Sequence, residues 1–218
     1  MLELNRLYNM DCMEGMKHFP DKYFDLAIVD PPYGINMDGG KIGGGKLCAV
    51  TDYAKKDWDS SPPEKTYFEE LFRVSKNQII WGANHFISRF CKDSSCWIVW
   101  DKDNTGNFAD CELAYTSFPT AVRKFKFRWN GMLQENMKNK EVRIHPTQKP
   151  VALYLWLLNN YAKRGDKILD THAGSASSLI ACHRANYDFI GFELDQDYYS
   201  LANERLQAEM AQLRFWVE

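Results

Sequence analysis

The stretch Lys167-Ile168-Leu169-Asp170-Thr171-His172-Ala173-Gly174-Ser175 decides the fold. Its first four residues are typical of a short buried strand, and Thr171 to Ser175 of a tight turn. A helix of small residues is expected over Ser177 to Ala185, and a second strand, Phe189 to Phe192, ends in Glu193. These elements predict one βαβ unit, which is the building block of a parallel sheet.

The acids of this unit predict a cofactor site. In such units the loop after the first strand packs against a cofactor, and an acid about 20 residues further on binds ribose hydroxyls. Asp170 and Glu193 have this spacing. Gly174 is the one glycine of the turn, and Ala176 stands where a second is usual. A dinucleotide, whose pyrophosphate needs those glycines, is therefore disfavoured, and a phosphate-free nucleoside cofactor such as S-adenosylmethionine is favoured.

A second informative stretch, Asp30-Pro31-Pro32-Tyr33, follows the apolar run Asp25 to Val29. The two prolines keep the chain extended, which leaves the carbonyls of Asp30 and Pro31 free to accept hydrogen bonds. Acceptors on the hydrogens of an aromatic amine localise its lone pair for attack. Tyr33 offers a flat face on which a base can stack, an interaction worth about 1 to 3 kcal/mol. The stretch predicts a site for an exocyclic amine, and a strand-ending turn with a buried tyrosine is the alternative.

Three motifs, in this order, resemble those of the amino-methyltransferases of DNA. They are Asp30-Pro31-Pro32-Tyr33-Gly34, His145-Pro146-Thr147-Gln148-Lys149-Pro150 and Ile168-Leu169-Asp170-Thr171-His172-Ala173-Gly174-Ser175. The catalytic motif precedes the cofactor motif, which is similar to the circularly permuted beta group of these enzymes. The resemblance covers nearly the whole chain. Many relatives have Pro-Phe in place of Thr171-His172 and glycine in place of Ala176.

The resemblance implies an α/β, Rossmann-like S-adenosylmethionine-dependent methyltransferase fold and a catalytic role for Asp30, Pro31, Pro32 and Tyr33. Asp11 is expected near the cofactor adenine, Glu193 at the ribose, and the segment around Thr147 to Lys149 over the methionine part. The expected cofactor-binding residues are Asp11, Asp30, Lys149, Asp170, His172, Gly174, Ser175 and Glu193.

The expected reaction is direct transfer of a methyl group from S-adenosylmethionine to the exocyclic amine of adenine in double-stranded DNA, in a restriction–modification setting. The target base must first be flipped out of the helix. None of the six cysteines follows a proline, so the nucleophile of a ring-carbon cytosine enzyme is missing. The alternatives are methylation of the cytosine amine, methylation of adenine in RNA, and a catalytically weak DNA-binding module on the same fold.

Composition agrees with a compact enzyme. The 218 residues are 45% hydrophobic, enough for one α/β core, so a single catalytic domain over 1–218 is expected. No apolar run of 18 residues and no leader is present, which makes the cytoplasm the default and a membrane partner unexpected. The cysteines lie at irregular spacings without C-x-x-C, so neither zinc nor disulfides are favoured, and amine methylation needs no metal.

The distribution of charge favours nucleic acid although the net charge is −2. Between Pro119 and Pro150 eight basic residues and two acids give a local charge of +6. In Arg123 to Trp129 aromatic and basic residues alternate, which predicts a strand with one phosphate-facing side. An ordinary solvated strand face is the alternative. The expected DNA-binding residues are Lys41, Lys46, Arg123, Lys124, Lys126, Arg128 and Arg143.

Two regions are expected to serve the substrate. Residues 35–60 predict a mobile, glycine-rich loop that closes over a flipped base, and Lys41 and Lys46 are expected to meet phosphates there. The run Gly40 to Lys46 fits G-x-x-x-x-G-K, but Leu47 stands where a phosphate-binding loop needs serine or threonine. Residues 102–145 predict a small target-recognition region, and hence a short recognition sequence or a homodimer.

The remaining elements alternate between strand and helix, which predicts a mostly parallel sheet with helices on both faces. Further strands are expected over Leu2 to Met10, Asn77 to Trp81 and Cys96 to Asp101. Further helices are expected from Ser60 or Ser61 through Phe72, over Pro150 to Ala162, and over Gln196 to Leu213.

Overall fold

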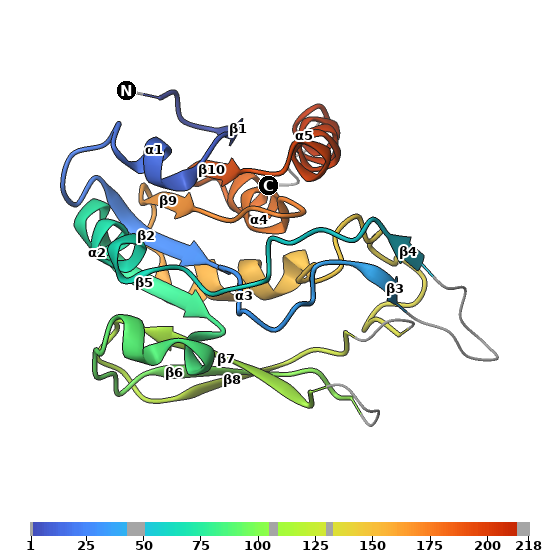
Figure 1. The fold of residues 1–218 in the computed structure, drawn as a ribbon, viewed down its shortest axis with the longest axis horizontal. Coiled ribbons are helices and arrows are strands. Elements are labelled where there is room, and N and C mark those ends of the chain that lie inside the picture. Colours follow the sequence, from blue (N-terminus) through green and yellow to red (C-terminus); the bar gives the residue numbers. More distant parts are fainter. Residues whose placement is uncertain (1, 43–50, 105–108, 130–132, 213–218) are drawn as a thin grey trace, which may run out of the picture.

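A computed structural model describes residues 2–42, 51–104, 109–129 and 133–212. Within these ranges the main sheet has eight strands in the order β1-β10-β9-β2-β5-β7-β6-β8 (Figure 1). Each strand is parallel to its neighbours except β7, which is antiparallel to both β5 and β6. The strands are β1 Arg6–Asn9, β2 Phe24–Val29, β5 Ser75–Trp81, β6 Trp97–Asp101, β7 Cys111–Thr116, β8 Arg123–Lys126, β9 Lys167–Asp170 and β10 Asp188–Glu193.

Helices cover both faces of this sheet, as predicted. Leu26 and Ile28 of β2 pack with α3, α4 and α5 on one face, whereas Ala27 and Val29 pack with α1 and α2 on the other. This alternation follows from the two-residue period of a strand whose two faces are both buried. The helices are α1 Cys12–Met16, α2 Lys65–Val74, α3 Val151–Tyr161, α4 Ser177–Arg184 and α5 Gln196–Met210.

The predicted βαβ unit is confirmed. β9 has the expected bounds, α4 begins at the expected residue, and β10 ends in Glu193. β1 is shorter than predicted, and β8 ends at Lys126 rather than Trp129. The antiparallel strand β7 and the short helix α1 were not predicted.

Helix α2 begins later than predicted, at Lys65, with an extended Glu64 as its cap. Pro63 is the physical reason, because a proline disfavours helical geometry in the residue before it, here Pro62. Pro62 instead packs where a side chain on Gly34 would be, since a Cβ there would lie 2.6 Å from the Pro62 Cδ atom. The segment before α2 therefore lies against the loop that follows β2.

The loop at residues 35–60 holds a two-stranded sheet of β3 Gly40–Ile42 and β4 Thr51–Tyr53. Its glycine-rich centre, with Lys46, lies outside the described residues, so the prediction of a mobile loop remains an expectation.

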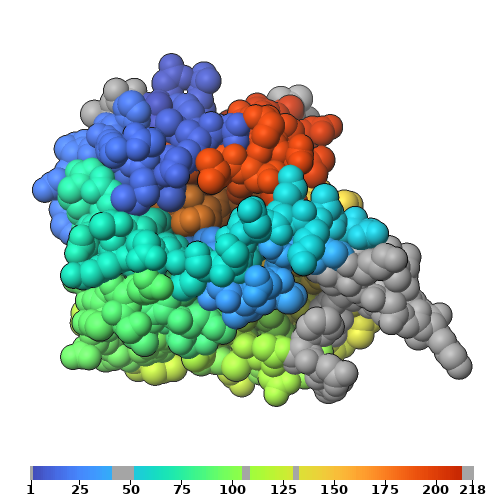
Figure 2. Space-filling model, viewed as in Figure 1, coloured from blue at the N-terminus to red at the C-terminus, as the bar shows by residue number. Residues whose placement is uncertain are grey.

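In Figure 2 an orange-brown part of the chain shows in a recess between the blue N-terminal residues and the teal residues of α2. No helix in the described part of the chain is long and apolar enough to cross a bilayer.

Candidate active site

Besides Asp101 at the end of β6, five acidic side chains lie at one edge of the sheet. Four of them follow or end parallel strands at their carboxyl ends, and Glu112 joins them because β7 runs the opposite way. The carboxyl ends of parallel strands are where ligands bind in open α/β sheets. In the order of the sheet, the acids are Asp11 after β1, Glu193 in β10, Asp170 in β9, Asp30 after β2 and Glu112 in β7.

Asp30 holds two donors, one on each carboxylate oxygen. The Tyr33 hydroxyl donates to Oδ1 at 2.7 Å, and the Lys149 ammonium donates to Oδ2 at 2.5 Å. The same ammonium lies 3.2 Å from the Tyr33 hydroxyl and 3.1 Å from Oε2 of Glu112. The amine bound at Asp30 in this structure is therefore the side-chain ammonium of Lys149.

Charge balance keeps Lys149 ionised although it is buried. Burial by itself lowers the pKa of Lys149, but the charges of Asp30 and Glu112 outweigh burial and leave the pKa above its usual value. Burial alone would raise the pKa of Glu112, but the charges of Lys149 and Lys102 outweigh burial and lower this pKa to about 2. The buried ammonium thus has two carboxylate partners, one on β7 and one after β2.

Tyr33 is fixed by its neighbours. Its ring stacks on His85, with 5.1 Å between ring centroids and 16° between planes. Gly82 has φ +66°, and a Cβ on it would lie 2.1 Å from the Tyr33 ring. Burial, with Asp30 beside it, raises the pKa of Tyr33 well above its usual value, so the hydroxyl keeps its proton and donates to Asp30.

Asp59 anchors the backbone of the predicted catalytic stretch. Its Oδ1 accepts from the amides of Tyr33 at 2.7 Å and Gly34 at 2.9 Å, and its Oδ2 accepts from the amide of Met37 at 2.7 Å. The residue is 2% exposed. Because the contacts join positions more than 20 residues apart, no local sequence signal identifies Asp59. Glu112 was missed as well, and its one signal is an acid within a largely apolar strand.

The predicted cofactor acids lie beside this site, because β9 and β10 follow β2 in the sheet. Asp170 accepts from the amide of His172 at 3.0 Å and from the Ser178 hydroxyl. Glu193 accepts from the amides of Gly174 and Asp195, both at 2.9 Å. Burial raises the pKa of Asp170 to about 7, and that of Glu193 to about 7 as well.

The other predicted cofactor residues occupy different positions around this edge. Asp11 caps α1 by accepting from the Met13 amide at 2.7 Å. The His172 ring bonds to Thr171 at 2.9 Å, and burial lowers the pKa of His172 to about 4, so it is neutral at pH 7. The Ser175 hydroxyl is buried against that of Ser177. The Lys149 ammonium lies on Asp30, another of the expected cofactor-binding residues.

The predicted DNA-binding residues whose side chains the structure describes lie at different places in the fold. Arg123 begins β8 at the opposite edge of the sheet from Asp30, because β8 is parallel to β6 and hence to β2. Lys124 pairs with Asp101 at 3.4 Å. Arg143 lies over the Trp129 ring at 4.7 Å. The side chains of Lys41 and Lys46 lie outside the described part of the chain.

The exposed basic side of β8 is partly neutralised. Asp103 binds Lys126 at 2.7 Å and accepts from Nε of Arg128 at 3.0 Å. The alternation predicted for this segment is confirmed, since Lys124, Lys126 and Arg128 are exposed while Phe125 and Phe127 are partly buried against the core. The number of cations open to phosphate is therefore smaller than the sequence count indicates.

Comparisons with known proteins agree with this geometry. A family model described as DNA methylase matches residues 119–204. The type II methyltransferase M2.DpnII of Streptococcus pneumoniae is 26% identical over 93% of this chain and 90% of its own length. M2.MboI of Moraxella bovis is 25% identical over 91% of this chain and 86% of its own. The M1.HpyAVI–SAM complex is 22% identical with a TM-score of 0.57, over 92% and 98% of the two chains.

The fold is that of the S-adenosylmethionine-dependent methyltransferases, as predicted. The family match and the two type II relatives confirm the narrower resemblance drawn from the three motifs, which is to the amino-methyltransferases of DNA.

Proposed function

We propose that this protein transfers a methyl group from S-adenosylmethionine to the exocyclic amine of adenine in DNA. One observation carries the proposal: Asp30, which binds an amine with the help of Tyr33, and Asp170, in the predicted cofactor turn, terminate neighbouring parallel strands. The type II methyltransferase relatives and the DNA methylase family match support DNA as the substrate.

The residues at this edge fit the proposed cofactor. S-adenosylmethionine supplies an electrophilic methyl group on a sulfonium, and it also carries an ammonium. The row of acids suits a ligand with two positive groups, and a carboxylate at the end of the second strand, Glu193, suits ribose hydroxyls. The fit thus rests on the donor and acceptor types at this edge.

In the proposed mechanism Asp30 and Tyr33 orient the target amine, which replaces the Lys149 ammonium at Asp30. Asp30 would take the proton that the amine nitrogen loses when it gains the methyl group, as the carbon–sulfur bond of the sulfonium breaks and a neutral thioether leaves. No side chain acts as a nucleophile, so positioning is the main source of catalysis. Asp59 supports this positioning by holding the amides of Tyr33 and Gly34.

The remaining sequence predictions form part of the proposal. We place the whole reaction in one domain, with target recognition in residues 102–145 and closure over a flipped base by residues 35–60. A region this small suits a short recognition sequence or a homodimer. The protein is expected to act in the cytoplasm.

The product identifies the reaction. We expect N6-methyladenine when DNA incubated with the protein and S-adenosylmethionine is digested to nucleosides and analysed by mass spectrometry. Detection of N4-methylcytosine would instead show that the cytosine amine is the target. Methylation of RNA but not of DNA would show that RNA is the substrate. A calorimetric titration that shows no binding of S-adenosylmethionine at high micromolar concentration would favour the binding-module alternative.

A variant separates the two halves of the site. We expect Asp30→Ala to abolish methyl transfer and to leave the Kd for S-adenosylmethionine within a few fold, because Asp30 belongs to the amine half. Loss of cofactor binding in this variant would show that Asp30 has been assigned to the wrong half.

A further inference from the structure

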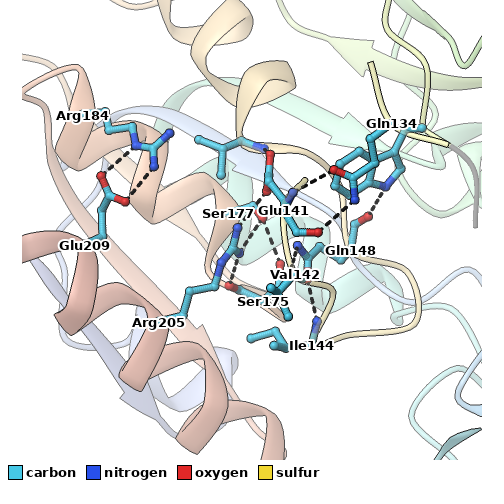
Figure 3. A network of polar contacts seen from close by, with 12 residues as sticks. Gln134, Glu141, Val142, Ile144, Gln148, Ser175, Ser177, Arg184, Arg205 and Glu209 are labelled. Atoms are coloured by element: carbon cyan, nitrogen blue, oxygen red, sulfur yellow. Dashed lines mark hydrogen bonds and ion pairs between the residues drawn. The ribbon is translucent and has the colours of Figure 1, made fainter. Parts of the chain in front are cut away.

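Arg205 of α5 connects two parts of the chain that are far apart in sequence (Figure 3). Its guanidinium donates to the carbonyl of Ser175 at 2.7 Å and to the hydroxyl of Ser177 at 2.9 Å. It also donates to Oε2 of Glu141 at 2.8 Å. One planar cation therefore joins the turn after β9 to the segment that precedes the His145 motif.

Glu141 is itself held on all sides. Its Oε1 accepts from the amide of Val151, the first residue of α3, at 3.0 Å. Its backbone amide donates to the Gln134 side chain at 2.8 Å, and its carbonyl accepts from the same side chain at 2.9 Å. The Glu141 side chain is 25% exposed and that of Arg205 is 20% exposed. This ion pair is therefore a fixed, half-buried contact, unlike a pair of mobile surface charges.

The turn has a physical need for such a contact. Ala176 is buried and has φ +59°, a left-handed conformation that residues with a Cβ adopt rarely. Arg205 binds the residues on either side of it, Ser175 and Ser177. The Ala176 backbone is held locally by its bonds to Ala173 and Ile180, and Arg205 adds contacts on both sides of this left-handed residue.

Displacement of the turn would disturb both cofactor acids. The Gly174 amide donates to Glu193, and the Ser178 hydroxyl donates to Asp170. Both donors lie within two residues of Ala176. A change at Arg205 is thus transmitted to Asp170 and Glu193, although Arg205 contacts neither acid in the bonds described above.

We propose that Arg205 is a positioning residue of the cofactor site, and that Glu141 holds it in place so that the segment from Gln134 to Gln148 and the cofactor turn form one unit. The affinity for S-adenosylmethionine then depends on residues that do not touch it. This inference rests on the proposed function, because S-adenosylmethionine is the ligand that reports the state of the turn.

The chain offers a matched control in the ion pair of Arg184 and Glu209. These residues join α4 to α5 through two bonds of 2.8 and 2.7 Å, away from the turn (Figure 3). We expect Arg205→Met to raise the Kd for S-adenosylmethionine at least tenfold in calorimetry. Arg184→Met removes the same chemical group and should leave the Kd within twofold. Equal weakening in both variants would mean general destabilisation and would overturn the proposal, as would an unchanged Kd in Arg205→Met.

A second substitution distinguishes positioning from a structural role. Glycine adopts positive φ without strain, so Ala176→Gly should restore most of the lost affinity when combined with Arg205→Met. In methylation assays, Arg205→Met should raise the KM for S-adenosylmethionine and change kcat less than threefold. Failure of Ala176→Gly to restore affinity would refute the role assigned to Arg205.

A second variant and the wild-type protein itself distinguish failure of this proposal from failure of the proposed function. If Arg205→Met does not fold, Glu141→Gln provides the test, with an expected three- to tenfold rise in Kd. An unchanged Kd in a folded Glu141→Gln protein would count against the proposal. If the wild-type protein binds no S-adenosylmethionine, the proposed function fails first, and that result is distinguishable because it appears without any substitution.

Discussion

Lys149 favours the ionised form of Asp30 in the free protein, against the effect of burial. Burial raises the pKa of Asp30, and the ammonium of Lys149 offsets part of that rise. A carboxylate that must accept hydrogen bonds from an amine has to be ionised. The lysine therefore favours the charged form of Asp30, for which the resemblance implies a catalytic role.

Removal of this charge has a predicted effect on pH dependence. In Lys149→Met the pKa of Asp30 should rise, because burial remains while the neighbouring positive charge is lost. The acid limb of the kcat/KM profile, which reports the free enzyme, should then move to higher pH, and Lys149→Arg, which keeps the charge, should move it less. Superimposable profiles for Lys149→Met and the wild type would show that Lys149 does not act on Asp30.

Gly82 is a second residue with a testable role. An alanine at this position would place its Cβ 2.1 Å from the Tyr33 ring at φ +66°. We expect Gly82→Ala to lower kcat at least tenfold while the Kd for S-adenosylmethionine stays within threefold, measured by single-turnover kinetics and calorimetry.

Gly165→Ala is the matched control for Gly82→Ala. Gly165 has φ +89°, but an added Cβ there meets no atom within 4 Å. Both variants carry a left-handed penalty of about 1 to 2 kcal/mol, and only Gly82→Ala disturbs Tyr33. Comparable activity in the two variants would contradict the role given to Gly82.

The charge of the exposed face of edge strand β8 depends on acidic residues outside the strand. Its alternating pattern gave the correct exposed face, but its charge depends on Asp101 and Asp103, which lie earlier in the chain. Exposed ion pairs contribute little to stability. If Lys126 and Arg128 bind phosphates, as the sequence predicts, Asp103 competes for both of them.

Neutralising this competitor should strengthen DNA binding. We expect Asp103→Asn to lower the Kd for DNA several fold at low salt and to steepen its salt dependence, because each phosphate contact adds about 0.9 to the logarithmic slope. Asp21→Asn changes the net charge equally but acts beside Arg73 at α2, so it should leave both quantities unchanged. The measurement is fluorescence anisotropy over a salt series, and equal effects of the two variants would exclude a local role.

Sequence alone predicted the elements whose signals are local. β9 and β10 were found because apolar runs end in acids at a spacing typical of one βαβ unit. β7 was missed because its Cys111-Glu112 start interrupts the apolar pattern and its antiparallel direction is set by tertiary packing. For the same reason Asp30, Asp170 and Glu193 were predicted, whereas Asp59 and Glu112 became visible only when the fold brought them to the site.

Across the whole molecule, the sheet gathers acids at one edge and leaves two of them short of partners for their charge. The pKa values of Asp170 and Glu193 are raised to about 7 by burial, from values near 4 in an unfolded chain. Between about pH 4 and pH 7 the folded protein then binds more protons than the unfolded chain. The two carboxyl groups therefore increase the free energy of unfolding as the pH falls from about 7 to about 4. This contribution is lost as the pH rises through 7.

A cationic cofactor reverses this preference, because it favours the charged carboxylates. We expect the affinity for S-adenosylmethionine to rise between pH 6 and pH 8, with release of protons on binding. Calorimetry in buffers of different ionisation enthalpy measures that release. Asp170→Asn should reduce the number of protons released, and proton uptake or no pH dependence would contradict the assignment of these acids to the cofactor.

The ammonium on Asp30 has one more consequence. Lys149 is tethered to the site, so it competes for Asp30 at an effective concentration on the order of millimolar or higher. A free small amine must displace this internal competitor without other help, whereas a base carried by bound DNA arrives with the binding energy of the whole duplex. We therefore expect the lysine to disfavour methylation of free small amines, so that methyl transfer requires bound DNA.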